Sequence, residues 1–288
     1  MHIVKFQGGL GNQMFQYAFG HALSPQVSFD FSWFAEVKKG SGSTVREYGL
    51  DVWRCTVCRA SEEDVSACQR TVQSHVPKLI RKWLHLPKYR SPQKIVERGS
   101  FYRPEFMTQS GLFEGYFQCE NYFSSIRQQL LADFTSTADI GKKNNALLAK
   151  ILSCNAVSLH IRRGDYLKLK NFYALCSPDY YFAAMTRIMK SLGDCQFFVF
   201  SDDPAWARQN IRAVSPMIFV DWNTGKSAYC DIWLMKHCKH NITANSSFSW
   251  WGAWLNENPN KLVISPRNWF AEKAANRNDI VPQSWVRL

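Results

Sequence analysis

Short apolar runs and amphipathic stretches alternate along most of the chain. Residues 1–7 alternate apolar and polar side chains as a strand does, and the glycine-rich residues 8–11 end that pattern. Residues 12–23 then carry apolar side chains at the spacing of one helix face. This order of strand, loop and helix predicts the first unit of a parallel sheet.

The second half of the chain repeats this order several times. Strands are predicted at residues 156–161, 196–200, 217–220, 241–244 and 262–265. Helices are predicted between them at residues 205–213, 227–238 and 248–256. Because parallel strands end at one edge of a sheet, and the loops at that edge bind ligands, the pattern predicts an α/β fold with two Rossmann-like halves.

Length and composition support two folded domains. The chain has 288 residues, of which 46% are hydrophobic and 15% are aromatic. At roughly 150 residues per domain this length predicts two domains, and the composition excludes a disordered chain. The polar residues 135–145 are the best linker candidate, so we expect an N-terminal domain at 1–145 and a C-terminal domain at 146–288.

Residues 75–98 form a basic insertion in the first domain. They contain seven Lys or Arg residues and a single acidic residue, Glu97. Residues 76–84 place apolar side chains on one face, which predicts a short basic amphipathic helix. We favour an ordinary surface helix whose apolar face packs on the core, because so short a helix binds lipid weakly. Contact with an anionic membrane is the alternative.

The formal net charge is +12, which favours an anionic partner: a nucleic acid, a lipid surface or a phosphorylated substrate. No apolar run approaches the roughly 20 residues that cross a bilayer, and residues 1–6 lack the pattern of an export signal. The nine scattered cysteines fit reduced thiols, and Cys55 and Cys58 lack a second pair for a zinc site. We therefore expect a cytoplasmic protein.

Three predicted loops that follow strands carry groups able to bind anions. His160, Arg162 and Asp165 lie where a strand ends, and the planar guanidinium of arginine suits phosphate oxygens. Residues 245–248 lie at a strand-to-helix junction, where backbone N–H groups favour a phosphate, and residues 8–13 form a similar junction. Together these loops predict a nucleotide diphosphate or nucleotide sugar held between two domains.

Four segments carry a resemblance to a known family. They are residues 8–18 (GGLGNQMFQYA), 160–166 (HIRRGDY), 201–204 (SDDP) and 244–255 (ANSSFSWWGAWL). In this order they resemble the motifs of the α-1,2-fucosyltransferases of glycosyltransferase family 11, especially the bacterial members. The first and last motifs are long and distinctive, whereas the Arg-Arg motif is shared with α-1,6- and protein O-fucosyltransferases. The resemblance does not extend to residues 24–150.

The resemblance implies a GT-B fold, in which two Rossmann-like domains face each other across a donor-binding cleft, with the acceptor on the N-terminal side. It implies an enzyme that transfers L-fucose from GDP-β-L-fucose, with inversion, to the 2-hydroxyl of a terminal β-galactose on a glycan such as a bacterial surface polysaccharide. It also implies no metal and no cofactor, since GDP-fucose is a substrate. The sequence is consistent with this because it has no Asp-x-Asp triplet to hold a metal ion.

By resemblance, the catalytic candidates are Arg162, Asp165 and Asn12. Arg162 would stabilise the charge that builds on the β-phosphate as GDP leaves. Asp165 would act as the general base or orient the arginines, and Asn12 would lie near the sugar and acceptor. Asp231 is the candidate for ribose or guanine. The donor-binding candidates are His160, Arg162, Gly9, Asn12, Gln13, Asp202, Asp231, Asn245, Ser246, Ser247 and Phe248.

Trp250, Trp251 and Trp254 admit two interpretations, a sugar-stacking platform or the core face of a helix. Their spacing of i, i+1 and i+4 prevents all three from facing one ligand, so we favour core packing.

Two other functions stay open from the sequence. One is an α-1,6-fucosyltransferase, which the aromatic motif at 244–255 argues against. The other is a basic nucleic-acid-binding protein, for which the sequence has no recognised motif, so we expect no nucleic-acid partner. The expected acceptor is a galactoside oligosaccharide whose identity the sequence does not give. A lipid-linked acceptor would place the protein peripherally on the inner membrane.

Overall fold

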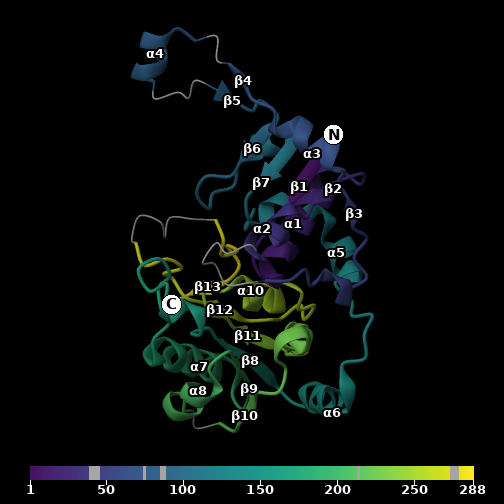
Figure 1. The fold of residues 1–288 in the computed structure, drawn as a ribbon. Coiled ribbons are helices and arrows are strands. Elements are labelled where there is room, and N and C mark those ends of the chain that lie inside the picture. The colour runs from purple at the N-terminus through teal and green to yellow at the C-terminus, as the bar shows by residue number, and fades with distance from the viewer. Residues whose placement is uncertain (39–45, 74–75, 85–88, 213–214, 273–278) are drawn as a thin grey trace. The chain divides into compact units, whose positions relative to one another are not determined.

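The structure is a computed structural model that describes residues 1–38, 46–73, 76–84, 89–212, 215–272 and 279–288. The chain folds into two compact units, Met1–Tyr48 with Cys55–Leu130 and Gly49–Arg54 with Leu131–Leu288. Each unit contains a parallel sheet with helices, as Figure 1 shows. The predicted α/β fold class with two Rossmann-like halves is confirmed, while the predicted cleft between them stays a prediction.

The first unit is built on a five-stranded sheet in the order β3-β2-β1-β7-β6. All of its strand pairs are parallel. From β1 the chain runs outward through β2 to β3 and then returns to the other side of β1 with β6 and β7. The order therefore reverses between β1 and β7. The strands are β1 (His2–Lys5), β2 (Ser28–Asp30), β3 (Cys58–Arg59), β6 (Lys94–Val96) and β7 (Gly111–Glu114).

The second unit is built on a six-stranded parallel sheet in the order β10-β9-β8-β11-β12-β13. Here the chain runs outward from β8 to β10 and returns on the other side with β11, so the order reverses between β8 and β11. Such a reversal opens a crevice at the carboxyl ends of the two strands, where α/β proteins bind their ligands. The strands are β8 (Ala156–Ile161), β9 (Gln196–Ser201), β10 (Met217–Val220), β11 (His240–Ile242), β12 (Val263–Ser265) and β13 (Val286–Arg287).

Helices cover and connect these sheets. The α-helices of the first unit are α1 (Leu10–Leu23), α2 (Ser32–Lys38), α3 (Glu62–Gln69) and α4 (Lys78–Trp83), and α5 (Arg127–Asp133) crosses the unit boundary. Those of the second unit are α6 (Gly141–Leu152), α7 (Pro178–Leu192), α8 (Pro204–Asn210), α9 (Tyr229–His237) and α10 (Ser247–Trp254). The 3-10 helices are η1 (Leu50–Val52), η2 (Pro104–Thr108), η3 (Glu120–Tyr122), η4 (Ser124–Ile126), η5 (Asp165–Leu167) and η6 (Gly225–Ser227).

The polar residues 135–145 are only partly a linker. Helix α6 begins inside them at Gly141, and the change between the units comes after Leu130 rather than after residue 145. The polar side chains of the first turn belong to a helix that buries Leu147 and Ile151 further along. Lys142, Lys143 and Asn145 form the solvent face of this amphipathic helix, whereas Asn144 is buried.

The three tryptophans of α10 belong to the core. Trp250 and Trp251 are fully buried, and Trp254 is nearly so. The Trp250 ring contacts Trp251 and Trp254, and its Nε1 donates a 2.7 Å hydrogen bond to the carbonyl of Ile280. Core packing, which we favour from the spacing, is confirmed.

The expectation that the basic insertion packs its apolar face on the core is wrong. Helix α4 forms within the predicted range, between strands β4 (Val72–Gln73) and β5 (Tyr89–Arg90), which pair antiparallel. Its apolar side chains lie in solvent, as the exposed Leu79 and Trp83 show. The periodicity correctly predicts which residues share a face, but it does not determine what covers that face.

Among the residues that the structure describes, no helix combines the length and apolar character needed to cross a bilayer.

Candidate active site

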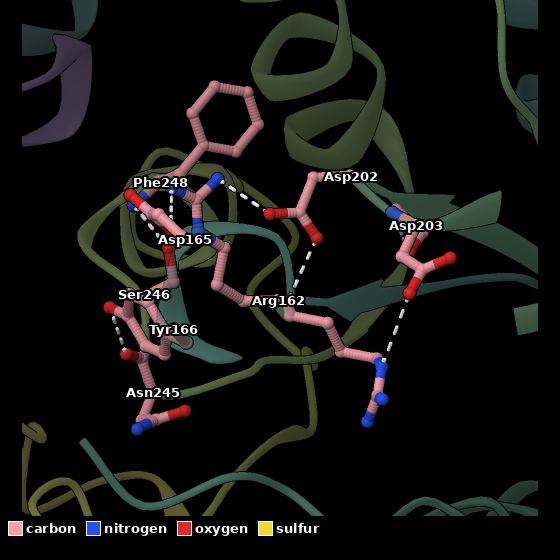
Figure 2. A network of polar contacts seen from close by, with 10 residues as sticks. Arg162, Asp165, Tyr166, Asp202, Asp203, Asn245, Ser246 and Phe248 are labelled. Carbon is pink, nitrogen blue, oxygen red and sulfur yellow. Dashed lines mark hydrogen bonds and ion pairs between the residues drawn. The ribbon is translucent and has the colours of Figure 1, made fainter. Parts of the chain in front are cut away.

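The carboxyl ends of three adjacent strands bring most predicted site residues of the second unit together, while Asp231 lies on α9 in a separate network. Arg162 comes directly after β8, Asp202 directly after β9, and Ser246 shortly after β11. Because β8 lies between β9 and β11, these loops meet where the strand order reverses. Segments more than 80 residues apart in the chain thus form one polar cluster at the edge of the sheet (Figure 2).

Arg162 is fixed at the centre of this cluster by two carboxylates. Its Nη2 lies 2.7 Å from Asp165 Oδ1, and its Nη1 lies 3.0 Å from Asp202 Oδ2. The guanidinium carbon also lies 5.4 Å from the centre of the Tyr166 ring. The side chain is 22% exposed, so an incoming anion can reach it. The two ion pairs use two of five N–H donors and hold the fork in one orientation, as phosphate recognition requires.

Asp202 connects the two arginine positions of the motif. Its Oδ2 pairs with Arg162, while its Oδ1 accepts a 2.8 Å hydrogen bond from the backbone N–H of Arg163. Gly164 makes this approach possible, because a Cβ at that position would lie 2.7 Å from Asp202 Oδ2. Asp202 therefore positions Arg162, and any larger residue at position 164 would displace the carboxylate.

The second arginine of the motif is held by a different element. Arg163 Nε lies 3.4 Å from Asp203 Oδ2, and its guanidinium carbon lies 3.9 Å from the centre of the Trp206 ring on α8. Asp203 also caps α8, since its Oδ1 accepts from the N–H of Trp206. Arg163 thus ties the strand end to α8, whereas Arg162 pairs with Asp165 in its own loop and with Asp202 after β9.

His160 is a buried imidazole with an unused polar atom. Its ring packs 5.5 Å from the Phe248 ring, centre to centre, and its buried Nδ1 has no hydrogen-bond partner within the described part of the chain. Burial, followed by the charge of Arg162, lowers the pKa of His160 to about 3. The imidazole is therefore neutral at physiological pH, and Nδ1 is suited to a hydrogen bond with a ligand or water.

The N-terminus of α10 forms the third side of the cluster. Ser246 is its N-cap, and its Oγ accepts a 3.3 Å hydrogen bond from the N–H of Phe248. Ser247 and Phe248 in the first turn are only partly buried. Backbone N–H groups and the helix dipole make this terminus favourable for a phosphate.

Asn245 lies in the same loop, but its side chain makes hydrogen bonds to other parts of the protein. It is fully buried, and its Nδ2 donates to the carbonyls of Ala174 and Trp269, both at 2.7 Å. Its Oδ1 accepts from the thiol of Cys176. Its backbone carbonyl accepts from the hydroxyl of Tyr166, which the sequence did not single out. Asn245 can influence a donor only through the position of these loops.

Asp231 lies in the first turn of α9, within a network of amide side chains. Its Oδ1 accepts a 2.7 Å hydrogen bond from Asn223, which in turn exchanges two hydrogen bonds with Asn144 of α6. Trp222 Nε1 also donates to Asn144. Burial raises the pKa of Asp231 to about 7, against a smaller opposite effect of the Asn223 hydrogen bond. This carboxyl group therefore changes charge near neutral pH.

The first unit holds its own cluster at the reversal between β1 and β7. Asn12 Oδ1 accepts a 2.9 Å hydrogen bond from Gln118, in the loop after β7. Gly8, at φ +77°, allows Asn12 to lie close, because a Cβ there would be 2.6 Å from Asn12 Nδ2. Gly9 is the N-cap of α1. Gln13 is fully buried and donates to the carbonyls of Gly8 and Glu47, so its side chain stabilises the loop.

Glu97 and Gln118 are two residues of this cluster that the sequence did not indicate. Glu97 Oε2 accepts from the N–H groups of Tyr116 and Phe117, at 2.7 and 2.9 Å. Phe117 has a φ of +51°, which a non-glycine residue rarely adopts, and these bonds stabilise it. The turn places Gln118 beside Asn12. Chain separation hid the contact, since the Asn12 and Gln118 positions differ by 106 residues.

All nine cysteines are free thiols, and no group of three or more His, Cys, Asp and Glu side chains that could hold a metal ion occurs in the described ranges.

A parallel α/β unit with an arginine, a helix N-terminus and a buried histidine at its strand reversal is typical of α/β proteins that bind an anionic ligand at the ends of their strands. The chain belongs to glycosyl transferase family 11, whose family model matches residues 85–288. The membership and glycosyltransferase class predicted from the four motifs are confirmed.

Full-length relatives are found in Escherichia coli. The chain is 30% identical over 300 residues to an alpha-1,2-colitosyltransferase, with 99% of this chain and 98% of that one covered. It is 32% identical over 313 residues to the O-antigen biosynthesis glycosyltransferase WbnK, with 98% of each chain covered. A shorter match is 28% identical over 153 residues and relates 50% of this chain to 41% of the galactoside 2-alpha-L-fucosyltransferase Sec1 of Mus musculus.

Proposed function

We propose that the protein is an inverting α-1,2-fucosyltransferase that transfers L-fucose from GDP-β-L-fucose to the 2-hydroxyl of a terminal β-galactose. The observation that carries the proposal is the position of Arg162, which two carboxylates orient beside the N-terminus of α10 at the strand reversal. This arrangement suits a diphosphate leaving group. The names of the relatives, which include α-1,2-transfer and a galactoside acceptor, support the linkage.

In the proposed reaction the acceptor oxygen attacks the anomeric carbon as the bond from that carbon to the β-phosphate oxygen breaks, and the proton of the acceptor hydroxyl passes to solvent water. GDP leaves with the electron pair, and Arg162 with the N–H groups of α10 stabilises the growing negative charge. Asp165 orients Arg162, for which its 2.7 Å ion pair is the support. Asn12, held by Gln118, contributes from the acceptor side. We propose that no metal or cofactor takes part.

The donor-binding role divides among several groups. Ser246, Ser247 and Phe248 bind the diphosphate through the helix terminus, and Asp202 acts through Arg162. His160 offers Nδ1 to the nucleotide, and its neutral state avoids repulsion from Arg162. Asn245, Gly9 and Gln13 shape the loops.

The proposal is tested by GDP release from GDP-fucose with EDTA present, in the presence and absence of a panel of β-galactosides. We expect release that requires an acceptor and survives EDTA, and a product whose linkage analysis gives α-1,2. Release that stops with EDTA, or an α-1,6 product, would contradict the proposal.

The donor sugar has one specific competitor, because the chain is 30% identical to a colitosyltransferase over nearly its full length. Colitose is L-fucose without its 3-hydroxyl. GDP-fucose and GDP-colitose therefore differ only at that position of the sugar. We expect GDP-fucose to give the higher kcat/KM when both donors are assayed with the same acceptor. A preference for GDP-colitose would change the proposed donor sugar but not the proposed GDP site or the proposed α-1,2 linkage.

GDP binding is expected to tighten as pH rises through neutrality. Asp231 has a pKa of about 7 in the free protein. Its carboxylate offers both oxygens as acceptors to guanine N–H or ribose O–H groups, whereas the protonated group turns one of them into a donor and carries no charge. Binding then favours the ionised form, so the GDP Kd is expected to be about 10-fold lower at about pH 8 than at about pH 6.

Isothermal titration calorimetry of GDP binding to the wild type and to Asp231→Asn at each pH checks this expectation. The ionisation of the GDP phosphates contributes equally to both proteins, so a difference between their pH profiles reports on Asp231. The dependence should disappear in Asp231→Asn and persist in Asp221→Asn, whose carboxyl pairs with Arg208 at the surface. An unchanged pH profile in Asp231→Asn would remove Asp231 from the nucleotide site.

A further inference from the structure

The short helix α4 presents an apolar face to solvent. Leu79 is 83% exposed and Trp83 is 79% exposed, while Ile80 and Leu84 are each 48% exposed. Large apolar side chains in such a group are unfavourable in water and mark an interaction surface. We use the name basic arm for residues 72–73, 76–84 and 89–90, which comprise β4, α4 and β5.

The charges of α4 are arranged to complement an anionic surface. At 3.6 residues per turn, the basic and the apolar side chains fall on opposite sides of this helix. The basic side is Lys78, Arg81 and Lys82, and the apolar side is Leu79, Ile80, Trp83 and the C-cap Leu84. The sequence of the basic arm contains no acidic residue. A second apolar surface alone would leave these cations without a partner, whereas an anionic lipid surface matches both the apolar and the basic arcs.

The chain segments before and after α4 are joined to each other. Strands β4 and β5 pair antiparallel, with Val72 opposite Arg90 and Gln73 opposite Tyr89. Below them the hydroxyl of Ser91 donates a 2.8 Å hydrogen bond to the carbonyl of Gln69. Two segments of backbone thus hold the ends of the α4 segment together, and the apolar side chains of α4 add nothing to the buried core.

We propose that the basic arm docks the protein on an anionic phospholipid bilayer, with Trp83 and Leu79 inserted at the headgroup level and Lys78, Arg81 and Lys82 bound to the lipid phosphates. The inference rests on the arm alone and not on the proposed activity. One function of such docking is to keep the enzyme near lipid-linked acceptors. A six-residue helix inserts weakly, so the combination of apolar and basic groups is needed for binding.

The test is co-sedimentation of the full chain with vesicles of phosphatidylcholine, with and without phosphatidylglycerol. We expect binding only to the mixed vesicles, with release at high salt. The triple variant Lys78→Gln, Arg81→Gln, Lys82→Gln should bind on the order of 100-fold more weakly, since each cation near an anionic surface contributes about one decade or less. The double variant Leu79→Ser, Trp83→Ser should bind at least about 10-fold more weakly, because two apolar anchors are lost.

Matched control variants show whether vesicle binding depends on the arm itself or on the total charge and apolar surface of the protein. Lys142→Gln, Lys150→Gln, Lys190→Gln removes the same charge from exposed positions on α6 and α7, and Phe182→Ser removes an exposed ring from α7. Both should bind vesicles as the wild type does. GDP release by all variants without vesicles should equal that of the wild type. If no variant has activity, the vesicle result still decides the role of the arm.

Three results would overturn the proposal. The first is wild-type protein that stays in the supernatant with mixed vesicles. The second is equal binding by the arm variants and their controls. The third is a dimer in light scattering that Leu79→Ser, Trp83→Ser converts to a monomer while vesicle binding is unaffected, because the apolar face then docks on a second copy.

Discussion

Replacing Arg162 with alanine is expected to lower kcat for GDP-fucose by about 1000-fold, since an oriented donor to a developing oxyanion contributes at this scale. The guanidinium is the only cationic group that Asp165 and Asp202 both hold among the described residues. Its loss removes the charge opposite the β-phosphate and leaves two carboxylates whose negative charge repels the diphosphate. The measurement is acceptor-dependent GDP release at saturating donor.

The control for this variant is Arg208→Ala. Arg208 also pairs with one carboxylate, Asp221 at 2.6 Å, but the pair is exposed and lies on α8 and the loop after β10. Its loss should leave kcat unchanged. Arg162→Lys should recover part of the activity, because it keeps the charge but not the planar fork. Wild-type turnover in Arg162→Ala would reject the assignment of the leaving-group site.

Most strands and helices of the second unit follow closely from the sequence, but α6, α7 and β13 were not predicted. The ranges predicted for β8 and β10 match the structure, and β9, α8, α9 and α10 differ by a few residues at their ends. Fully buried strands leave continuous apolar runs, and polar motifs such as Ser201–Pro204 end them abruptly. The site could be anticipated for the same reason, because Arg162 and Asp202 each follow a strand directly and Ser246 lies in the short loop after β11.

The residues that position the site could not be anticipated. Gln118 acts on Asn12, and Asn144 acts through Asn223 on Asp231, yet each pair is separated by many residues and neither amide lies in a motif. Their importance arises only when the strand order brings the loops together. The burial of Asn245 is another such case. A polar residue at a strand-to-helix junction predicts a ligand contact, but the structure shows that its amide donates to the carbonyls of Ala174 and Trp269.

The two strand reversals explain why the family motifs are widely spaced along the chain. Residues 8–18 carry the loop after β1, where the first sheet reverses, and residues 160–166 and 244–255 carry the loops after β8 and β11, where the second sheet reverses. The loops at such a reversal are where α/β proteins commonly bind their ligands. The distinctive motifs therefore lie at the two reversals, whereas the family model also matches residues 85–150, where no such motif stands.

The Trp250→Ala variant is expected to lose about 3–5 kcal/mol of unfolding free energy, the usual cost of removing a large aromatic side chain from a core. Trp250 is fully buried against Trp251, Trp254 and Trp285, and its indole N–H bonds the carbonyl of Ile280. Alanine leaves a cavity in the core beside α10 and an unpaired carbonyl at Ile280.

Urea unfolding followed by circular dichroism measures this loss. Trp250→Phe should lose less than Trp250→Ala, because it refills most of the cavity but still leaves the Ile280 carbonyl unpaired. The sugar-stacking interpretation makes the opposite prediction: a raised KM for the acceptor with unchanged stability. Because α10 begins at the N-cap Ser246, loosening its core should also weaken GDP binding while acceptor KM stays the same. A stable Trp250→Ala protein with weak acceptor binding would return this tryptophan to the substrate site.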